Sequence, residues 1–169
     1  MNAQELRQLS EELALGPVPG RHVCLWQDDA DLLMSILHKG LTEYLDIARL
    51  MPSEEPPPGA EREAAKRIER ALRTKLKELA SQLAQENRRQ ILVVAGTELL
   101  ARYGVGIGAF YDEYVSDKTM VVLTTRRVVA DSPVLDTLPD FVILDPDAAY
   151  RYIRRLLESD EAVVTSQEE

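Results

Sequence analysis

Acidic side chains follow two apolar segments at positions where they could hold a metal ion. Glu98 comes shortly after the run Ile91–Ala95, and Asp145 and Asp147 come directly after the run 141–144. The carboxyl ends of parallel strands meet at one edge of a sheet, which is where α/β proteins bind ligands. Carboxylates gathered there could hold Mg²⁺ and support metal-assisted phosphoryl transfer or phosphodiester cleavage. The alternative interpretation is structural, with Asp145 capping a helix and Asp147 in the first turn of that helix.

Two further patterns of nucleotide-binding proteins are incomplete or misplaced. The strand expected at Val23–Trp26 is followed by Gln27, Asp28 and Asp29, whereas a phosphate-binding loop needs glycines and a lysine at that place. The segment Gly104–Ala109 matches the dinucleotide fingerprint G-x-G-x-x-G/A, but this fingerprint binds pyrophosphate only directly after a strand. Here it follows the helical sequence TELLARY, so we interpret it as a glycine-rich break between two helices. No cofactor is predicted.

The residues that come nearest to a zinc pattern are His22, Cys24 and His38. They have no fourth ligand and no CxxC or HxxxH pair, so we interpret them as structural. No Ser-His-acid or Cys-His signature supplies a nucleophile for covalent catalysis. Because Cys24 is the only cysteine, no internal disulfide is expected, and a cytoplasmic location is the simplest expectation.

Length, charge and hydropathy exclude several classes of function. The 169 residues suit a single α/β domain over 1–169. The 20 Lys and Arg residues against 29 Asp and Glu residues give a net charge of −9, which repels phosphate backbones. No apolar run approaches the roughly 18 residues that cross a bilayer, and the N-terminus has no apolar signal core. We therefore expect neither membrane association nor direct nucleic-acid binding.

Continuous apolar runs predict a parallel sheet. Ile91–Ala95 and Met120–Leu123 are rich in β-branched residues and lack polar alternation, which is typical of strands covered on both faces. Apolar residues between them recur at helical spacing, enough for a crossover between parallel strands. With strands at 23–26 and 141–144, the latter as a third inner strand, we predict an α/β three-layer sandwich around a small, mainly parallel sheet of about four strands.

A long helical hairpin is predicted as an insertion before the strand Ile91–Ala95. The segment 32–51 has the wide apolar stripe of a helix, and the proline-rich segment 52–59 is expected to be an exposed loop. Residues 60–87 form the longer second helix, in which apolar residues recur every three or four positions: Ile68, Leu72, Leu76, Leu79 and Leu83. Such a narrow stripe suits packing on one partner, either the sheet of the same chain or another copy in a coiled-coil-like pairing, and we favour a hairpin with the preceding helix over the second copy. Residues 160–169 are expected to be a frayed acidic tail.

Basic residues are concentrated on this second helix. They are interleaved with glutamates, a pattern typical of a solvated helix face. If the protein binds a partner, we expect the contact residues to lie on this helix and on a loop past a strand: Arg67, Arg70, Arg73, Leu76, Arg126 and Arg127. In the alternative enzyme interpretation, Arg126 or Arg127 would clamp a phosphate group.

The order of apolar blocks over roughly residues 90–127 resembles that of BrxB-like proteins, small accessory components of bacteriophage exclusion systems. The matching features are a strand that ends at Gly96, the pairs Leu99-Leu100 and Arg102-Tyr103, a helix ending near Tyr111, and the strand sequence VVLTT at 121–125. The resemblance implies a fold like that of P-loop NTPases without the catalytic loop. It also implies a non-catalytic partner protein in a multi-subunit defence assembly.

The missing catalytic signatures, the acidic net charge and the long charged helix predict a non-catalytic interaction or scaffold subunit of a bacterial multi-protein complex, and the resemblance implies phage defence as its setting. The partner would be another protein, or a second copy bound through the long helix. The alternative is a nucleotide- or Mg²⁺-dependent phosphotransfer or nuclease-type enzyme that uses Glu98, Asp145 and Asp147.

Overall fold

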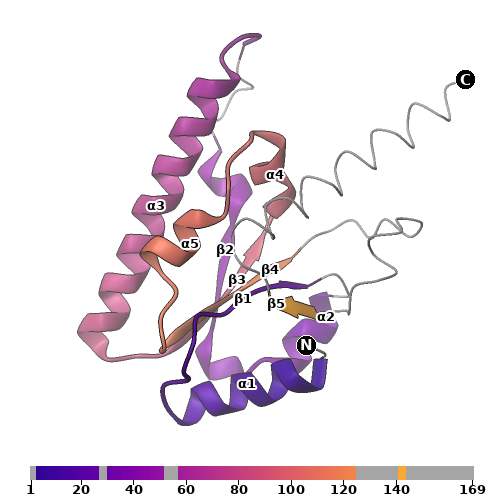
Figure 1. Ribbon diagram of the computed structural model, residues 1–169, viewed down its shortest axis with the longest axis vertical. Coiled ribbons are helices and arrows are strands. Elements are labelled where there is room, and N and C mark those ends of the chain that lie inside the picture. The colour runs from indigo at the N-terminus through magenta and orange to yellow at the C-terminus, as the bar shows by residue number, and fades with distance from the viewer. Residues whose placement is uncertain (1–2, 27–29, 52–56, 125–140, 144–169) are drawn as a thin grey trace, which may run out of the picture.

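The computed structural model describes residues 3–26, 30–51, 57–124 and 141–143, and the fold is α/β (Figure 1). In chain order its elements are α1 (Ala3–Leu15), β1 (Val23–Trp26), α2 (Ala30–Ile36), the 3₁₀ turn η1 (Lys39–Leu41), β2 (Thr42–Asp46), the 3₁₀ turn η2 (Ile47–Leu50), α3 (Glu61–Glu86), β3 (Gln90–Ala95), α4 (Thr97–Arg102), α5 (Gly108–Glu113), β4 (Thr119–Thr124) and β5 (Phe141–Ile143).

The strands form one sheet in the order β2-β3-β4-β1-β5. The first four strands in this order run parallel, and β5 lies antiparallel beside β1. The neighbouring parallel strands β3 and β4 are joined by α4 and α5, so the crossover unit expected over residues 90–125 is confirmed. The predicted α/β sandwich with a mainly parallel sheet is also confirmed.

Helices cover both faces of the sheet and bury two apolar clusters (Figure 1). Along β3 the side chains alternate between them: Leu92 and Val94 join the cluster under α3, α4 and α5, whereas Ile91 and Val93 join the cluster under α1 and α2. All four are at most 5% exposed. A strand with both faces covered must be apolar at every position, which explains why this run shows no polar alternation.

The predicted continuous helix over 32–51 is wrong. The helix α2 ends at Ile36, and the chain then forms η1, the strand β2 and η2. Gly40 weakens a helix at this place, because glycine costs about 1 kcal/mol relative to alanine inside a helix. All five residues of β2 pair in register with β3, which satisfies backbone groups that the interrupted helix would leave open. In the described residues before β3, the insertion therefore consists of β2 with its flanking 3₁₀ turns and the long helix α3, and these residues form no helical hairpin.

The predicted strand at 141–144 is present in part, as β5, but not as an inner strand. Within the described residues it pairs only with β1, and it runs antiparallel. The predicted loop at 52–59 is described only from residue 57 onward, where Pro57, Pro58 and Gly59 are exposed. The expected acidic tail at 160–169 lies outside the described residues.

The apolar stripe of α3 packs within the chain, as favoured, but its partner is the sheet. Ile68, Leu72 and Leu76 are fully buried in the cluster that also contains Leu92 and Val94 of β3. The helix ends at Asn87, which adopts a left-handed conformation with φ of 50° and donates its N–H to the carbonyls of Leu83 and Ala84. This cap turns the chain directly into β3.

Arg89 joins the end of α1 to the turn before β3. Its Nε donates to the carbonyl of Leu13 at 2.6 Å and its Nη2 to the carbonyl of Ala14 at 2.9 Å. Both carbonyls lie in the last turn of α1, where backbone acceptors have no intrahelical partner and a positive charge is favourable. This side chain therefore fixes α1 against the sheet.

We predict that Arg89→Ala lowers the free energy of unfolding by about 1.5 kcal/mol, because two charge-assisted hydrogen bonds are lost. Urea denaturation measures the change. Arg88→Ala is the matched control, since the exposed Arg88 bonds only to Glu86 among the described residues and should leave stability almost unchanged. Equal losses in the two variants would contradict the role assigned to Arg89.

Candidate functional site

The carboxyl ends of β1, β2, β3 and β4 meet at one edge of the sheet, the expected place for a ligand in an α/β protein. Two threonines join the ends of β3 and β4 there. Thr97 donates through Oγ1 to the carbonyl of Thr124 at 2.7 Å, and Thr124 donates through Oγ1 to the carbonyl of Val94 at 2.9 Å. Thr97 is fully buried and Thr124 is half-buried, and both hydroxyls are occupied by backbone carbonyls, so they tie the start of α4 and the end of β3 to β4.

Asp46, at the end of β2, is an acidic residue at this edge that was not among the predicted site residues. Its Oδ1 accepts a hydrogen bond from the Ala48 N–H at 3.0 Å and so caps η2. A Cβ added to Gly96, which has φ of +75°, would lie 3.3 Å from the same oxygen. Gly40 was a local signal that the predicted helix ends early, but no local pattern identifies residues 42–46 as a strand.

The carboxylates predicted to form a metal site are not brought together by the part of the chain that the structure describes. The backbone of Glu98 lies in α4, immediately after the edge residue Thr97, but its side chain is outside what is described. Asp145 and Asp147 also lie outside the described residues. Within those residues no three His, Cys, Asp or Glu side chains form a group that could hold a metal ion. Their convergence stays a prediction.

The other chemical patterns have structural roles. Gly104 follows α4 with φ of +70°, and the Val105 N–H donates to the Leu100 carbonyl at 2.7 Å, a helix-ending bond. The interpretation of this segment as a break between helices is therefore confirmed. Cys24 is fully buried on β1, where desolvation raises the pKa of its thiol well above the usual value. The Cys24 thiolate is therefore disfavoured as a nucleophile or a metal ligand.

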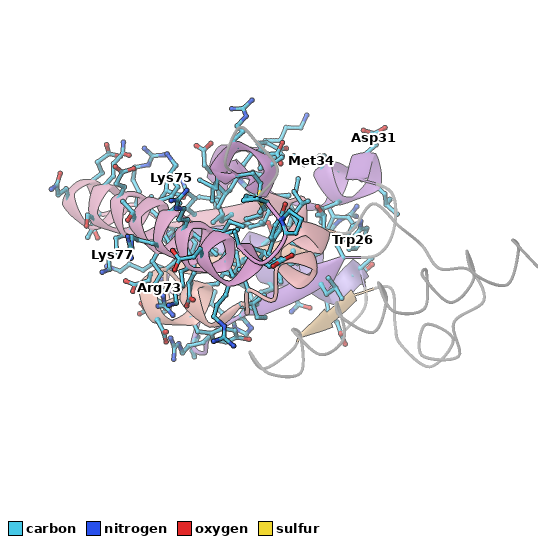
Figure 2. All side chains as sticks on the ribbon, turned by 90° about the horizontal axis from the view of Figure 1, so that it is seen from above. Trp26, Asp31, Met34, Arg73, Lys75 and Lys77 are labelled. Atoms are coloured by element: carbon cyan, nitrogen blue, oxygen red, sulfur yellow. The ribbon has the colours of Figure 1, made fainter. Side chains whose placement is uncertain are left out.

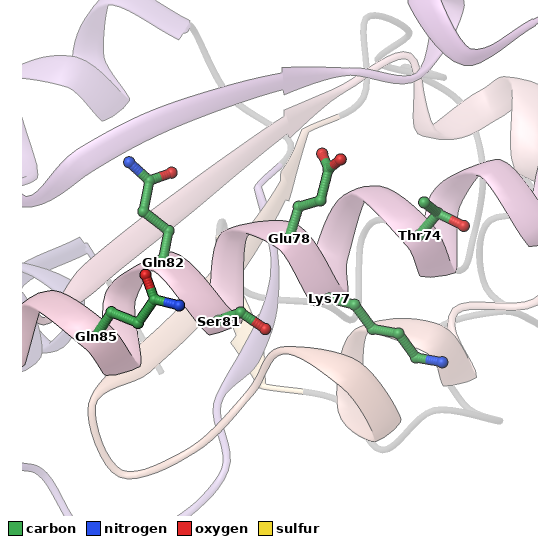
Figure 3. A pocket seen from close by; sticks show the side chains of 6 residues that line it. All are labelled: Thr74, Lys77, Glu78, Ser81, Gln82 and Gln85. Atoms are coloured by element: carbon green, nitrogen blue, oxygen red, sulfur yellow. The ribbon is translucent and has the colours of Figure 1, made fainter.

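The outward surface of α3 differs from the sheet edge in charge and exposure. Six exposed side chains make up what we call the outer face of α3: Lys66, Arg67, Arg70, Thr74, Lys77 and Ser81. Two shallow grooves run along it, with volumes of about 360 and 480 Å³, and both include Thr74 and Lys77. In Figure 3, Glu78 and Gln82 project from one side of the helix and Lys77 from the other.

The predicted contact residues on α3 divide into three groups. Leu76 is fully buried, so its side chain belongs to the core and we remove it from the contact surface. Arg73 is paired within the chain. Arg67 and Arg70 are exposed, and with Lys66 they form no ion pair among the described residues. Arg126 and Arg127 lie outside those residues, and their part of the prediction stays open.

Arg73, labelled on α3 in Figure 2, joins this helix to α5 through Asp112 and Glu113 and also pairs with Glu69 on its own helix. Its guanidinium bonds Asp112 at 3.1 Å, Glu69 at 3.2 Å and Glu113 at 3.3 Å. The hydrogen bond to Asp112, followed by those to Glu69 and Glu113, raises the pKa of Arg73 above its usual value. Lys77 approaches Glu113 at 3.9 Å. These pairs hold α5 against α3 and leave the cations nearer the start of the helix without a counter-charge from α5.

Local charge sets this helix apart from the rest of the protein. Between residues 62 and 77 there are seven Lys or Arg residues and two Glu residues, in a chain whose net charge is −9. One of the two, Glu69, is paired with Arg73. The first half of the outer face therefore carries an excess of positively charged side chains.

No protein-family model, curated protein or solved structure matches this chain. In the part that the structure describes, no helix has the length and apolar character needed to span a membrane. The class that the fold defines is thus an α/β domain with a basic exposed helix.

We predict that Arg73→Gln and Arg70→Gln separate the structural arginine from the exposed one. Arg73→Gln should lower the free energy of unfolding by roughly 0.5–1 kcal/mol, because it breaks the two ion pairs that link α3 to α5 and the pair with Glu69. Arg70→Gln should leave stability unchanged. Thermal denaturation at low and high salt measures both, and the Arg73 effect should shrink at high salt. A loss of stability in Arg70→Gln equal to that in Arg73→Gln would contradict this division.

Proposed function

We propose that this protein is a non-catalytic interaction subunit of a bacterial multi-protein complex, and that it binds an acidic surface of a partner protein through the outer face of α3. The observation that carries the proposal is the set of three exposed cations, Lys66, Arg67 and Arg70, which have no ion pair among the described residues. Lys66 and Arg70 line the smaller of the two grooves, and Arg67 is next to Lys66 in the sequence. The apolar core holds this helix in place.

The packing of α3 favours this use of its outer face. Ile68, Leu72 and Leu76 fix the rotation of the helix against the sheet, so the cations on the opposite side are presented without a prior folding step. Preorganised charge of this kind raises association rates and selects complementary partners. An acidic protein fits better than a nucleic acid, because the net charge of −9 opposes a long phosphate backbone but not a local acidic patch.

The sequence at the first strand-to-helix junction supports the non-catalytic part of the proposal. Only residues 27–29 separate β1 from α2, and they are Gln27, Asp28 and Asp29. A phosphate-binding loop at such a junction needs glycine N–H groups around the phosphates and a lysine beside them. These three residues supply neither, and two of them carry negative charge.

The resemblance to BrxB-like proteins supplies the setting that we propose. Those proteins are accessory components of bacteriophage exclusion systems, and an accessory role agrees with a chain that presents a docking helix. We therefore propose that the partner is another component of such a defence assembly.

Charge reversal on the outer face tests the proposal. We predict that Arg67→Glu/Arg70→Glu lowers the amount of partner that co-purifies with the tagged protein from its host by about tenfold or more, because two favourable charge contacts become repulsive. Quantitative mass spectrometry measures recovery, and circular dichroism checks that the variant is folded.

The matched control is Arg7→Glu/Lys39→Glu, which makes the same change in net charge on α1 and η1. Arg7 and Lys39 are exposed, and their elements pack with the apolar cluster on the face of the sheet opposite α3, so recovery of the partner should match the wild type. Undiminished recovery with Arg67→Glu/Arg70→Glu, or an equal loss with the control, would refute α3 as the docking surface.

A further inference from the structure

The free edge of β2 is a second surface that can receive a partner. Among the described strands, β2 pairs only with β3, so its other edge is not hydrogen-bonded to any strand there. Glu43 and Tyr44, in the middle of this strand, are exposed, and the Tyr44 side chain is 57% exposed. Exposed strand edges present rows of N–H and C=O groups that can pair with another chain.

The hydrogen bond of the Tyr44 N–H identifies which groups face outward. In a strand, the N–H groups of alternate residues point to the same side. The Tyr44 N–H is bonded to Oε1 of Glu43 at 3.1 Å and not to β3. The carboxylate of Glu43 thus occupies the position that the backbone carbonyl of an added strand would take. Charged side chains at a strand edge commonly limit unwanted pairing. Here the Glu43 carboxylate is bonded to the N–H of Tyr44, the central residue of the strand.

We propose that a segment of a partner protein in the β conformation adds to the sheet beside β2. This segment carries a Lys or Arg opposite Glu43 and an apolar residue opposite Tyr44. In such a complex a carbonyl of the segment replaces the Glu43 carboxylate on the Tyr44 N–H. Glu43 then loses its hydrogen bond, and a cation on the neighbouring strand restores a charge-assisted contact. Tyr44 lies on the α2 side of the sheet, where its hydroxyl contacts Sδ of Met34 at 2.6 Å, so an apolar neighbour extends this contact.

A second copy of the chain is a poorer occupant of this edge. Antiparallel pairing of two β2 strands about Tyr44 sets Leu45 opposite Glu43 and gives the carboxylate no cation. Parallel pairing in register sets the two Glu43 side chains beside each other, which is unfavourable. The net charge of −9 on each copy adds repulsion in both arrangements. The charge at the edge therefore selects a different, basic segment.

The test uses a labelled, end-blocked peptide of alternating threonine and valine with lysine at its centre, and the same peptide with glutamate there. Fluorescence anisotropy measures binding to the full chain, and NMR follows the Tyr44 amide. We expect the lysine peptide to bind with a shift of the Tyr44 amide resonance and about fivefold more tightly than the glutamate peptide. Glu43→Gln should remove this preference, and Glu11→Gln, an exposed change on α1, should keep it.

Three results would overturn the proposal. They are no binding of the lysine peptide, binding that leaves the Tyr44 amide resonance unchanged, and a shift of that resonance when the protein concentration is raised without peptide. The last result would assign the edge to a second copy. The Arg67→Glu/Arg70→Glu variant should bind the lysine peptide as the wild type does, because the α3 face is a separate surface. A failure at β2 is thereby distinguished from a failure at α3.

Discussion

Burial of the apolar stripe of α3 against the sheet is the constraint on which the rest of this structure depends. Ile68, Leu72 and Leu76 have no exposed surface and share a cluster with strands β2, β3, β4 and β1. Rotating the helix would expose these side chains at a cost of about 1.5–3 kcal/mol each. The opposite side of α3 must therefore face outward, and that side carries the excess of cations. The core thus determines where the charge is displayed.

The inner strands could be predicted from sequence because both of their faces are buried. Ile91 to Val94 are apolar at every position, and neither a surface helix nor an edge strand imposes that requirement. The strand β2 could not be recognised in the same way. Of its five residues only Leu45 is buried, and Leu41, Tyr44, Leu45 and Ala48 also have the spacing of a helix stripe. Pairing with β3 decides the outcome, and no local pattern encodes that long-range contact.

The outer face of α3 could be predicted only in part, because local periodicity shows which side chains are exposed but not which of them are paired with distant residues. Arg67 and Arg70 are correctly placed on an exposed helix face by periodicity alone. Periodicity also assigns Leu76 to the apolar stripe, which is why it belongs to the core. Arg73 looked equivalent to its neighbours, but its partners Asp112 and Glu113 are 39 and 40 residues further along the chain. Sequence shows which charges are present, whereas the fold decides which of them are neutralised within the chain and which stay available to a partner.

Lysine reactivity in the free protein and in its purified complex tests the central claim most directly. Mass spectrometry after brief acetylation measures each lysine separately. The account predicts that Lys66 and Lys77, on the outer face of α3, lose most of their reactivity in the complex, while the exposed Lys39 and Lys118 keep theirs. Unchanged reactivity of Lys66 and Lys77, with or without protection of the other two, would show that the partner binds elsewhere.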